Sequence, residues 1–148
     1  MARPLTPKRL SSPAAAYIAG LVDGEGTITL TAQHRGENRR LVVSISNTEL
    51  PLLEYVRQQV GVGRITSKRT YSSKHSPSYT YVVTSRQALA LLSQLAPYLR
   101  TYKVRRARLA LYNYIKLTPR NGKYTPAAKR ARLRFEHKLL AERPIRSH

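Results

Sequence analysis

Residues 17–27 read YIAGLVDGEGT, and this segment is the most informative part of the sequence. Small side chains recur every four positions in and just before it, at Ala16, Gly20 and Gly24. Residues at this spacing share one face of an α-helix. A face made only of small residues lets the backbone of a second helix approach closely. The apolar residues lie towards the other faces and anchor the helix in its own core; they are Ile18, Leu21 and Val22.

Two acids, Asp23 and Glu25, lie at the C-terminal end of this predicted helix, in a chain that has only 7 acidic residues. A carboxylate there adds to the negative end of the helix dipole, which disfavours the anion unless a cation binds. Two such helices packed on their small faces would bring two carboxylates together, as in a site for a hard cation such as Mg²⁺. The alternative is that Gly20 and Gly24 pack within one domain and that Glu25 is a solvated helix terminus.

The flanking sequence alternates between helical and strand patterns. Ser12 can cap the first helix with Pro13 at its first position, where proline is preferred. Polar and apolar residues alternate from 27 to 34, which is typical of a strand with one solvated face. Such patterns predict helices at 12–24, 50–60, 87–95, 102–117 and 125–141, strands at 27–34, 39–47, 62–69 and 79–85, a turn at 35–38 and a loop at 70–78. The order predicts an α+β domain with helices on one face of an antiparallel sheet.

The composition indicates a partner of opposite charge. The 148 residues suit a single domain, 1–148, with an extended basic arm at 1–11. Lys and Arg number 27, which gives a net charge of +20, so we expect a polyanion, with nucleic acid ahead of an anionic membrane. The chain has no cysteine, which excludes disulfides and thiolate metal sites. The apolar run at 14–22 is too short to span a bilayer, and no signal-peptide cleavage site follows it. We therefore expect an intracellular protein of the cytoplasm, nucleoid or organelle matrix, not a secreted one.

The segment IAGLVDGEG resembles the LAGLIDADG motif of homing endonucleases. It departs from that motif at Ile18, Val22, Gly24 and Glu25. The order of elements also resembles the family, as do the GVG at 61–63 and the run PYLRTYKVRRA at 97–107. The resemblance implies the αββαββα homing-endonuclease fold, with an antiparallel DNA-binding sheet and additional C-terminal helices. It also implies hydrolysis of phosphodiester bonds in DNA with two metal ions.

The family's catalytic residues are transferred by position. The resemblance assigns metal binding to Glu25 and Gly24, with Mg²⁺ as the cofactor and Mn²⁺ or Ca²⁺ able to occupy the same sites. It assigns the positioning of the attacking water to Asn47. The alternative role for Asn47 is to cap a turn. Lys103 corresponds to the basic residue at the scissile phosphate, with a general phosphate contact as its alternative. Asp23 is expected to be structural, accepting backbone hydrogen bonds near the helix junction.

The solvated face of the sheet is the expected DNA reader, since a two-stranded ribbon fits the major groove. The residues expected on it are Thr29, Thr31, Gln33, Arg35, Asn38, Arg40, Ser44, Thr66, Lys68, Thr80 and Val82. The alternative is that the cations contact only phosphates, which is the commoner fate of protein–DNA contacts. Several helix cations are expected to face phosphates or solvent: Arg105, Arg106, Arg108, Lys129, Arg130, Arg132 and Arg134.

The chain contains one copy of the motif, whereas cutting both strands needs two acids. A homodimer packed on Ala16, Gly20 and Gly24 supplies the second acid and requires a pseudo-palindromic target. We therefore expect a metal-dependent, site-specific double-strand endonuclease with no membrane partner and no small-molecule substrate. Two alternatives remain, an RNA-binding maturase and a DNA-binding regulator that has lost cleavage.

Overall fold

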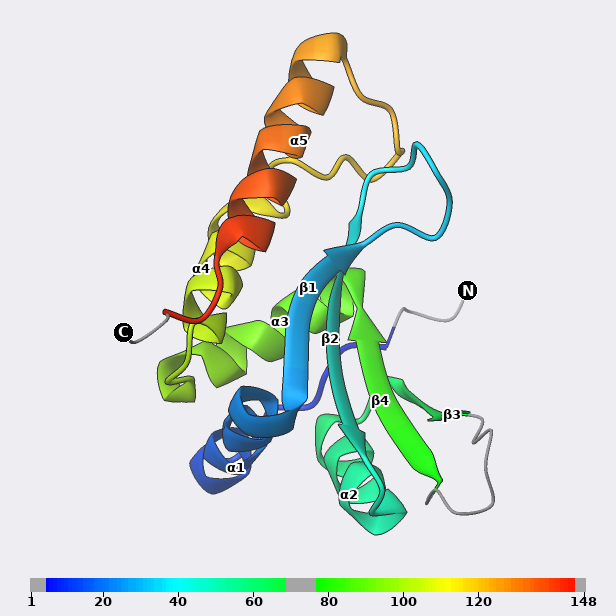
Figure 1. Cartoon of the computed structure of the whole chain (residues 1–148), viewed down its shortest axis with the longest axis vertical. Helices are drawn as coiled ribbons and strands as arrows, with labels where there is room; N and C mark the ends of the chain where they lie inside the picture. The colour runs from blue at the N-terminus through cyan, green and yellow to red at the C-terminus, as the bar shows by residue number, and fades with distance from the viewer. Residues whose placement is uncertain (1–4, 69–76, 146–148) are drawn as a thin grey trace.

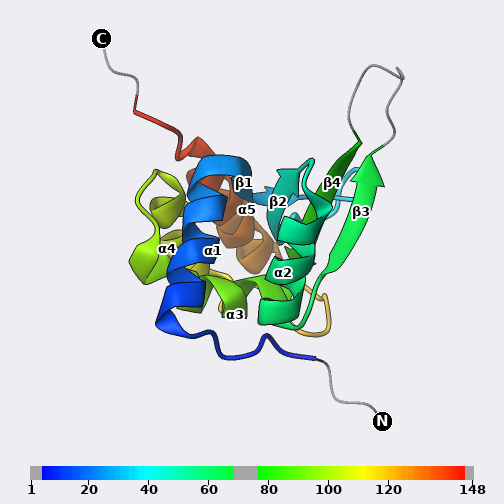
Figure 2. The ribbon, with the colours of Figure 1, turned by 90° about the horizontal axis from the view of Figure 1, so that it is seen from below.

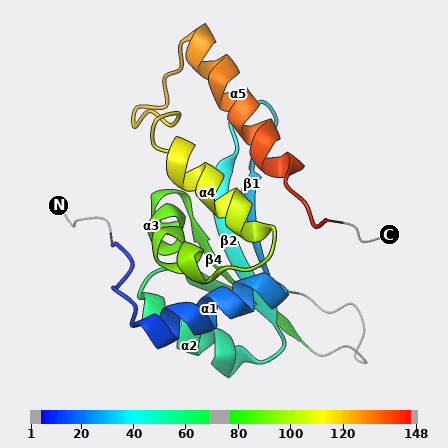
Figure 3. The ribbon, with the colours of Figure 1, turned by 90° about the vertical axis from the view of Figure 1, so that its left-hand side faces the viewer.

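The computed structural model describes residues 5–68 and 77–145 and contains one four-stranded antiparallel sheet in the order β1-β2-β4-β3. Helices α3, α4 and α5 cover one face of this sheet, and α1 and α2 lie across its lower end (Figures 1 and 3). The fold is the predicted one. The elements are α1 (Ser12–Glu25), β1 (Gly26–Thr31), β2 (Arg40–Asn47), α2 (Leu50–Val60), β3 (Arg64–Lys68), β4 (Ser78–Thr84), α3 (Ser85–Leu95), the 3-10 turn η1 (Ala96–Tyr98), α4 (Lys103–Asn113) and α5 (Pro126–Ala141).

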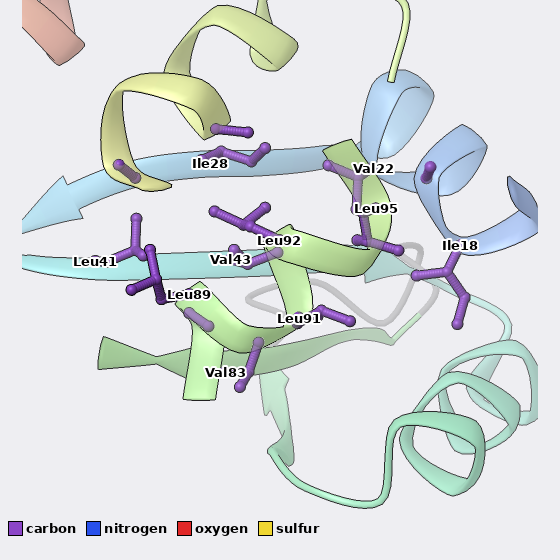
Figure 4. Packing of buried hydrophobic residues seen from close by; sticks show 14 of the residues in the cluster. Ile18, Val22, Ile28, Leu41, Val43, Val83, Leu89, Leu91, Leu92 and Leu95 are labelled. Carbon is purple, nitrogen blue, oxygen red and sulfur yellow. The ribbon is translucent and has the colours of Figure 1, made fainter. Parts of the chain in front are cut away.

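The core lies between the sheet and the helices. Apolar residues alternate along β1 and β2, and the antiparallel register places Ile28 opposite Val43 and Ile45 opposite Tyr81. Because successive side chains of a strand point to opposite faces, one face of the sheet is buried and the other remains accessible. Figure 4 shows the buried side packing against the helices through Val22, Ile28, Leu41, Val43, Val83, Leu89, Leu92 and Leu95.

Helix α1 has its cap one residue earlier than expected. The side chain of Ser11, not Ser12, accepts a hydrogen bond from the amide of Ala14 at 3.3 Å, and Pro13 lies in the first turn. The helix ends just before Gly26, where a Cβ would lie 2.6 Å from the Cα of Val22. Only glycine therefore fits where the chain turns from α1 into β1.

The first hairpin is shorter than predicted because α5 takes the backbone groups of Arg39. The Arg39 amide donates to Oε1 of Glu136 at 3.3 Å, and its carbonyl accepts from Nη2 of Arg132 at 2.6 Å. Those groups are thus unavailable for pairing with β1, and the ladder ends at Thr31 and Arg40. The predicted strand residues 32–34 lie in the loop between β1 and β2 instead.

Other boundaries differ from the predictions by a few residues. Strand β3 begins at Arg64 because Gly61 and Gly63 have φ values of +82° and +101°, which end helix α2 and bend the chain. Helix α4 ends at Asn113, not at 117. The predicted loop 70–78 falls almost entirely outside the described residues. No helix in the described segments is long and apolar enough to cross a membrane.

Residues 5–11, part of the expected basic arm, contain no helix or strand and are held to the body of the domain. Lys8 donates its amide to the carbonyl of Val60 at 2.7 Å. Two glutamines of α3 bind this segment: Gln94 contacts both Lys8 and Leu10, and Gln87 donates to the carbonyl of Leu5 at 2.6 Å. These bonds fix the chain that leads into α1.

Candidate active site and nucleic-acid interface

The carboxylate of Glu25 meets the amide side chain of Asn47 at the lower end of the sheet. Glu25 is the last residue of α1 and Asn47 the last residue of β2, and the pairing of Gly26 with Ile45 brings the two ends together. Nδ2 of Asn47 donates to Oε2 of Glu25 at 2.6 Å, and Oδ1 of Asn47 accepts from the amide of Glu49 at 2.7 Å. Asn47 therefore caps the turn that follows β2 and also orients Glu25, which is exposed. Its role towards a water molecule stays a prediction.

Asp23 has the structural role that the sequence predicts. Its Oδ2 accepts from the amide of Arg100 at 2.7 Å. Its Oδ1 accepts from the amide of Thr101 at 3.1 Å and from the Thr101 hydroxyl at 2.6 Å. Three donors therefore hold this carboxylate against the segment that leads into α4, so Glu25 is the freer of the two acids in the motif.

Lys103 binds the C-terminal end of α1. Its Nζ donates to the carbonyl oxygens of Val22 and Asp23 at 2.8 and 2.9 Å, and the residue is only 8% exposed. Burial lowers its pKa from the ordinary 10.5; the negative charge of Asp23 opposes this shift, and Arg106 adds to it. An ammonium group has three protons to donate, so one remains after these two bonds. The predicted contact with the scissile phosphate would use that proton, while the two carbonyl bonds neutralise the negative end of the α1 dipole.

The small-residue face of α1 is open. Ala16, Gly20 and Gly24 are all exposed, and a Cβ added at either glycine would meet nothing within 4 Å. The alternative that these glycines pack within their own domain is therefore wrong. Tyr17 and Tyr55 lie near this face as an edge-to-face pair, with ring centroids 5.8 Å apart, and both are exposed. Figure 2 views this end of the molecule, with α1 and α2 towards the reader.

One chain offers an incomplete set of metal ligands. Within residues 5–68 and 77–145, no three His, Cys, Asp or Glu side chains gather in a group that could hold a metal ion. The donors at the end of α1 are the carboxylate of Glu25 and the carbonyl oxygen of Gly24, which lies in the last turn, where carbonyls lack helical partners. Both are hard oxygen ligands of the kind that Mg²⁺ binds, and Mg²⁺ needs several more oxygens from outside this chain. The residues present therefore fit part of a Mg²⁺ site.

The register places most of the predicted reading residues on the accessible face of the sheet. Ser44 pairs with Thr27 and Val82, and Thr80 pairs with Ser46 and Thr66, so the polar positions line up across all four strands. Alternation along the strands also places Thr27, Val42, Ser46 and Arg64 on this face, beyond the residues expected there. The predicted reading residues that lie on strands are Thr29, Thr31, Arg40, Ser44, Thr66, Thr80 and Val82. The side chain of Lys68 lies outside the described part.

Three further predicted readers, Gln33, Arg35 and Asn38, lie in the loop after β1 and not on a strand, because the ladder already ends at Thr31. Gln33 and Arg35 are exposed, and Asn38 is half-buried. Arg40 is half-buried, and within the described residues its buried Nε has no hydrogen-bond partner. A partner from outside the chain would satisfy that donor.

Three helix cations expected to face phosphates or solvent bind groups of the protein instead: Arg105, Arg106 and Arg132. Arg105 pairs with the carboxylate of Glu142 at 2.6 Å. Arg106 donates to the carbonyls of Ile28 and Glu142, each at 2.9 Å, and so ties α4 to β1 and to the end of α5. Arg132 is 1% exposed and pairs with Glu136 at 3.2 Å. Most of the groups they bind are distant in sequence, so the helical pattern alone could not separate them from Arg108, Arg130 and Arg134, which are exposed.

Comparisons with known proteins agree with this arrangement. The family of LAGLIDADG-like domains matches residues 12–96, more than half of the chain. The fold is similar to the homing endonuclease I-CvuI, solved with its target and Ca, at 21% identity and a TM-score of 0.73 over 93% of this chain and 86% of that chain. The archaeal intron-encoded homing endonuclease I-Vdi141I, complexed with DNA, is 20% identical with a TM-score of 0.67 over 90% and 86%. I-LtrWI, a LAGLIDADG homing endonuclease bound to target DNA, is 16% identical with a TM-score of 0.61, over 97% of this chain but only 49% of that chain.

Proposed function

This chain belongs to the family of LAGLIDADG-like domains, and from that premise we propose that it is a site-specific double-strand DNA endonuclease of the homing type. The observation that carries the proposal is the exposed carboxylate of Glu25, held by Asn47 beside an open helix face made of small residues. Neighbours of the same fold are solved on DNA targets. The net charge of +20 supports a polyanionic substrate. The proposal also places that substrate inside the cell.

The active unit in this proposal is a homodimer. The exposed face of Ala16, Gly20 and Gly24 lets two α1 helices approach closely, which places one Glu25 from each chain near the two-fold axis. The relative lengths support this assembly, because the chain covers 86% of I-CvuI but only about half of I-LtrWI (49%). Two copies are thus comparable in size to the longer protein. An isologous dimer of this kind reads a pseudo-palindromic site.

Hydrolysis in this proposal depends on a divalent metal ion. Glu25 and the carbonyl of Gly24 from each chain would hold the ion with hard oxygen ligands. A bound Mg²⁺ would supply Lewis-acid chemistry, which makes the phosphate easier to attack and water easier to deprotonate. Asn47 holds the Glu25 carboxylate in place. Lys103 has one N–H left after its two carbonyl bonds and can donate it in a hydrogen bond to the phosphate. I-CvuI has been solved in the presence of Ca and of Mg, which agrees with a divalent cofactor.

The accessible face of the sheet reads the target sequence. Strand β2 has 8 residues, which extend about 26 Å at about 3.3 Å per residue. This length corresponds to about eight base pairs at about 3.4 Å each. Each protomer would therefore cover one half-site, with Arg40 suited to a guanine edge.

Incubation of the purified protein with a randomised duplex library and Mg²⁺, followed by sequencing of the cut ends, tests the proposal. We expect a palindrome-like consensus cut at its centre, and no cutting in excess EDTA. A bound but uncut consensus would identify a DNA-binding regulator. A preference for folded RNA over every duplex would identify a maturase instead.

A further inference from the structure

A cleft lies at the end of the sheet opposite to α1. One wall is the loop of residues 32–39, which connects β1 and β2. The other is distant in sequence and consists of the loop of residues 114–125, which connects α4 and α5, and the first turn of α5. The cleft measures about 490 Å³ and is lined by Gly36, Glu37, Asn38, Gly122, Tyr124 and Lys129. Both loops lie at the upper end of the molecule in Figures 1 and 3. The matched family segment ends at residue 96, so one wall of the cleft lies outside it.

Positive charge dominates the surroundings of this cleft. Glu37 is the only acid in residues 32–40 and 115–135. The lining itself holds this acid and one cation, Lys129. Three further exposed cations adjoin lining residues in the sequence: Arg35 in the hairpin loop, Lys123 in the helical loop and Arg130 in α5. Cations gathered in this way attract a polyanion rather than a single carboxylate.

A buried ion pair holds the two walls in a fixed relation. Glu136 and Arg132 of α5 are each 1% exposed, with Nε of Arg132 at 3.2 Å from Oε2 of Glu136. Arg132 also donates to the carbonyl of Leu117 and to the hydroxyl of Thr118 at the start of the helical loop. On the other side, the pair binds the amide and the carbonyl of Arg39, the last residue of the hairpin loop. This ion pair therefore fixes the position of Lys123 and Lys129 relative to the hairpin loop.

We propose that this cleft binds the phosphate backbone of duplex DNA just outside the half-site that the sheet reads. The proposal rests on the proposed function and extends its DNA surface. The hairpin loop continues directly from β1 and β2, so a duplex lying along the accessible face of the sheet runs on past this end. β2 alone spans about eight base pairs, so the cleft meets phosphates from about the ninth base pair outward from the two-fold axis. Phosphate contacts of this kind add affinity without adding sequence preference.

Binding of the selected target with and without flanks tests the proposal. One duplex ends at the edge of the consensus, and two others extend it on both sides by about six base pairs of unrelated sequences. For the wild type we expect both extended duplexes to bind about tenfold more tightly than the trimmed one. The double variant Lys123→Ala/Lys129→Ala should abolish this advantage. The log–log slope of affinity against salt on the extended duplex should also become shallower by about 0.9 for each phosphate that the variant no longer neutralises.

The matched control is the double variant Arg108→Ala/Arg134→Ala, which removes the same charge from exposed positions of α4 and α5 away from the cleft lining. It should weaken trimmed and extended duplexes alike and retain the advantage of the flanks. Equal melting temperatures would show that all proteins are folded. The inference would be overturned if the wild type bound no more tightly to the extended duplexes, or if the control variant also lost the advantage of the flanks. In either case a cut consensus would still support the proposed function. If no duplex is selected or cut, the proposed function fails and the inference fails with it.

Discussion

Glu25 and Glu136 lie at opposite ends of the molecule, and their surroundings differ in kind. Glu136 is 1% exposed and is bound by Arg132 and by both the amide and the guanidinium of Arg39. Glu25 is exposed and bonds to Asn47, a neutral partner that orients it without neutralising it. A buried charge requires compensation by the protein, whereas an exposed one is free to bind a cation from outside. The comparison therefore separates an acid that serves the fold from one available for chemistry.

The largest effect is expected from Glu136→Ala. This change leaves Arg132 buried without its counter-charge and frees the backbone of Arg39. Breaking a buried pair in this way costs about 3–5 kcal/mol. Urea unfolding followed by circular dichroism measures the decrease in stability. Glu37→Ala removes an exposed acid from the adjacent loop and should change the stability by less than about 0.5 kcal/mol. If both variants were destabilised by the same small amount, the contrast between the buried and the exposed acid would disappear.

Glu25→Gln should act in the opposite way, with the fold preserved and cleavage abolished. The amide keeps the shape of the side chain but lacks the negative charge that a metal ion needs. We expect the cleavage rate to fall at least about a hundredfold, equivalent to about 2.7 kcal/mol, with an unchanged melting temperature. Target affinity should be maintained or improved, because two anions beside the phosphates are removed. Substantial Mg²⁺-dependent nicking by this variant would assign the metal to another acid, with Asp23 the first to examine.

Gly20→Leu should break the dimer without unfolding the chain. No atom lies within 4 Å of a Cβ at this position, so the monomer accommodates the side chain, whereas two leucines would separate the facing helices. We expect dimerisation to weaken at least about tenfold, or about 1.4 kcal/mol, as measured by light scattering across a concentration series.

Gly26→Ala provides the contrasting change. Its Cβ would meet the Cα of Val22 at 2.6 Å, so this substitution should lower the melting temperature of the monomer itself.

A fully active monomer, either of the wild type or of Gly20→Leu, would contradict the proposed homodimer.

The smallest effect concerns the pKa of Lys103, which burial lowers. At a pH between the lowered pKa and the ordinary 10.5, the unfolded chain still holds a proton that the folded chain has released. The free energy of unfolding should therefore rise with pH across that window, and the burial penalty should be fully present below it. NMR titration of lysine side chains gives the pKa directly, with Lys103→Met assigning the signal. A lysine that titrates at its ordinary value would show that the amine is solvated.

The fold could be predicted from local patterns, because alternation along strands and helical spacing depend on neighbouring residues. The hairpin boundary could not, because residues 32–34 continue the strand pattern while Arg132 and Glu136 take the backbone groups of Arg39, 93 and 97 residues away. The cations of α4 show the same limit. Arg106 and Arg108 look alike in sequence, but only Arg106 lies within reach of the carbonyls of Ile28 and Glu142.

The order of elements, the motif at the end of α1 and the net positive charge that favours a polyanion can all be read from the sequence. Which charged groups are available depends on the tertiary fold. Asp23 and Glu25 are two residues apart, but Asp23 is bound by Arg100 and Thr101, which lie 77 and 78 residues away. In the same way, Nζ of Lys103 donates to the carbonyl oxygens of Val22 and Asp23. Whether a charge is free depends on partners brought near by folding, and no local pattern records those partners.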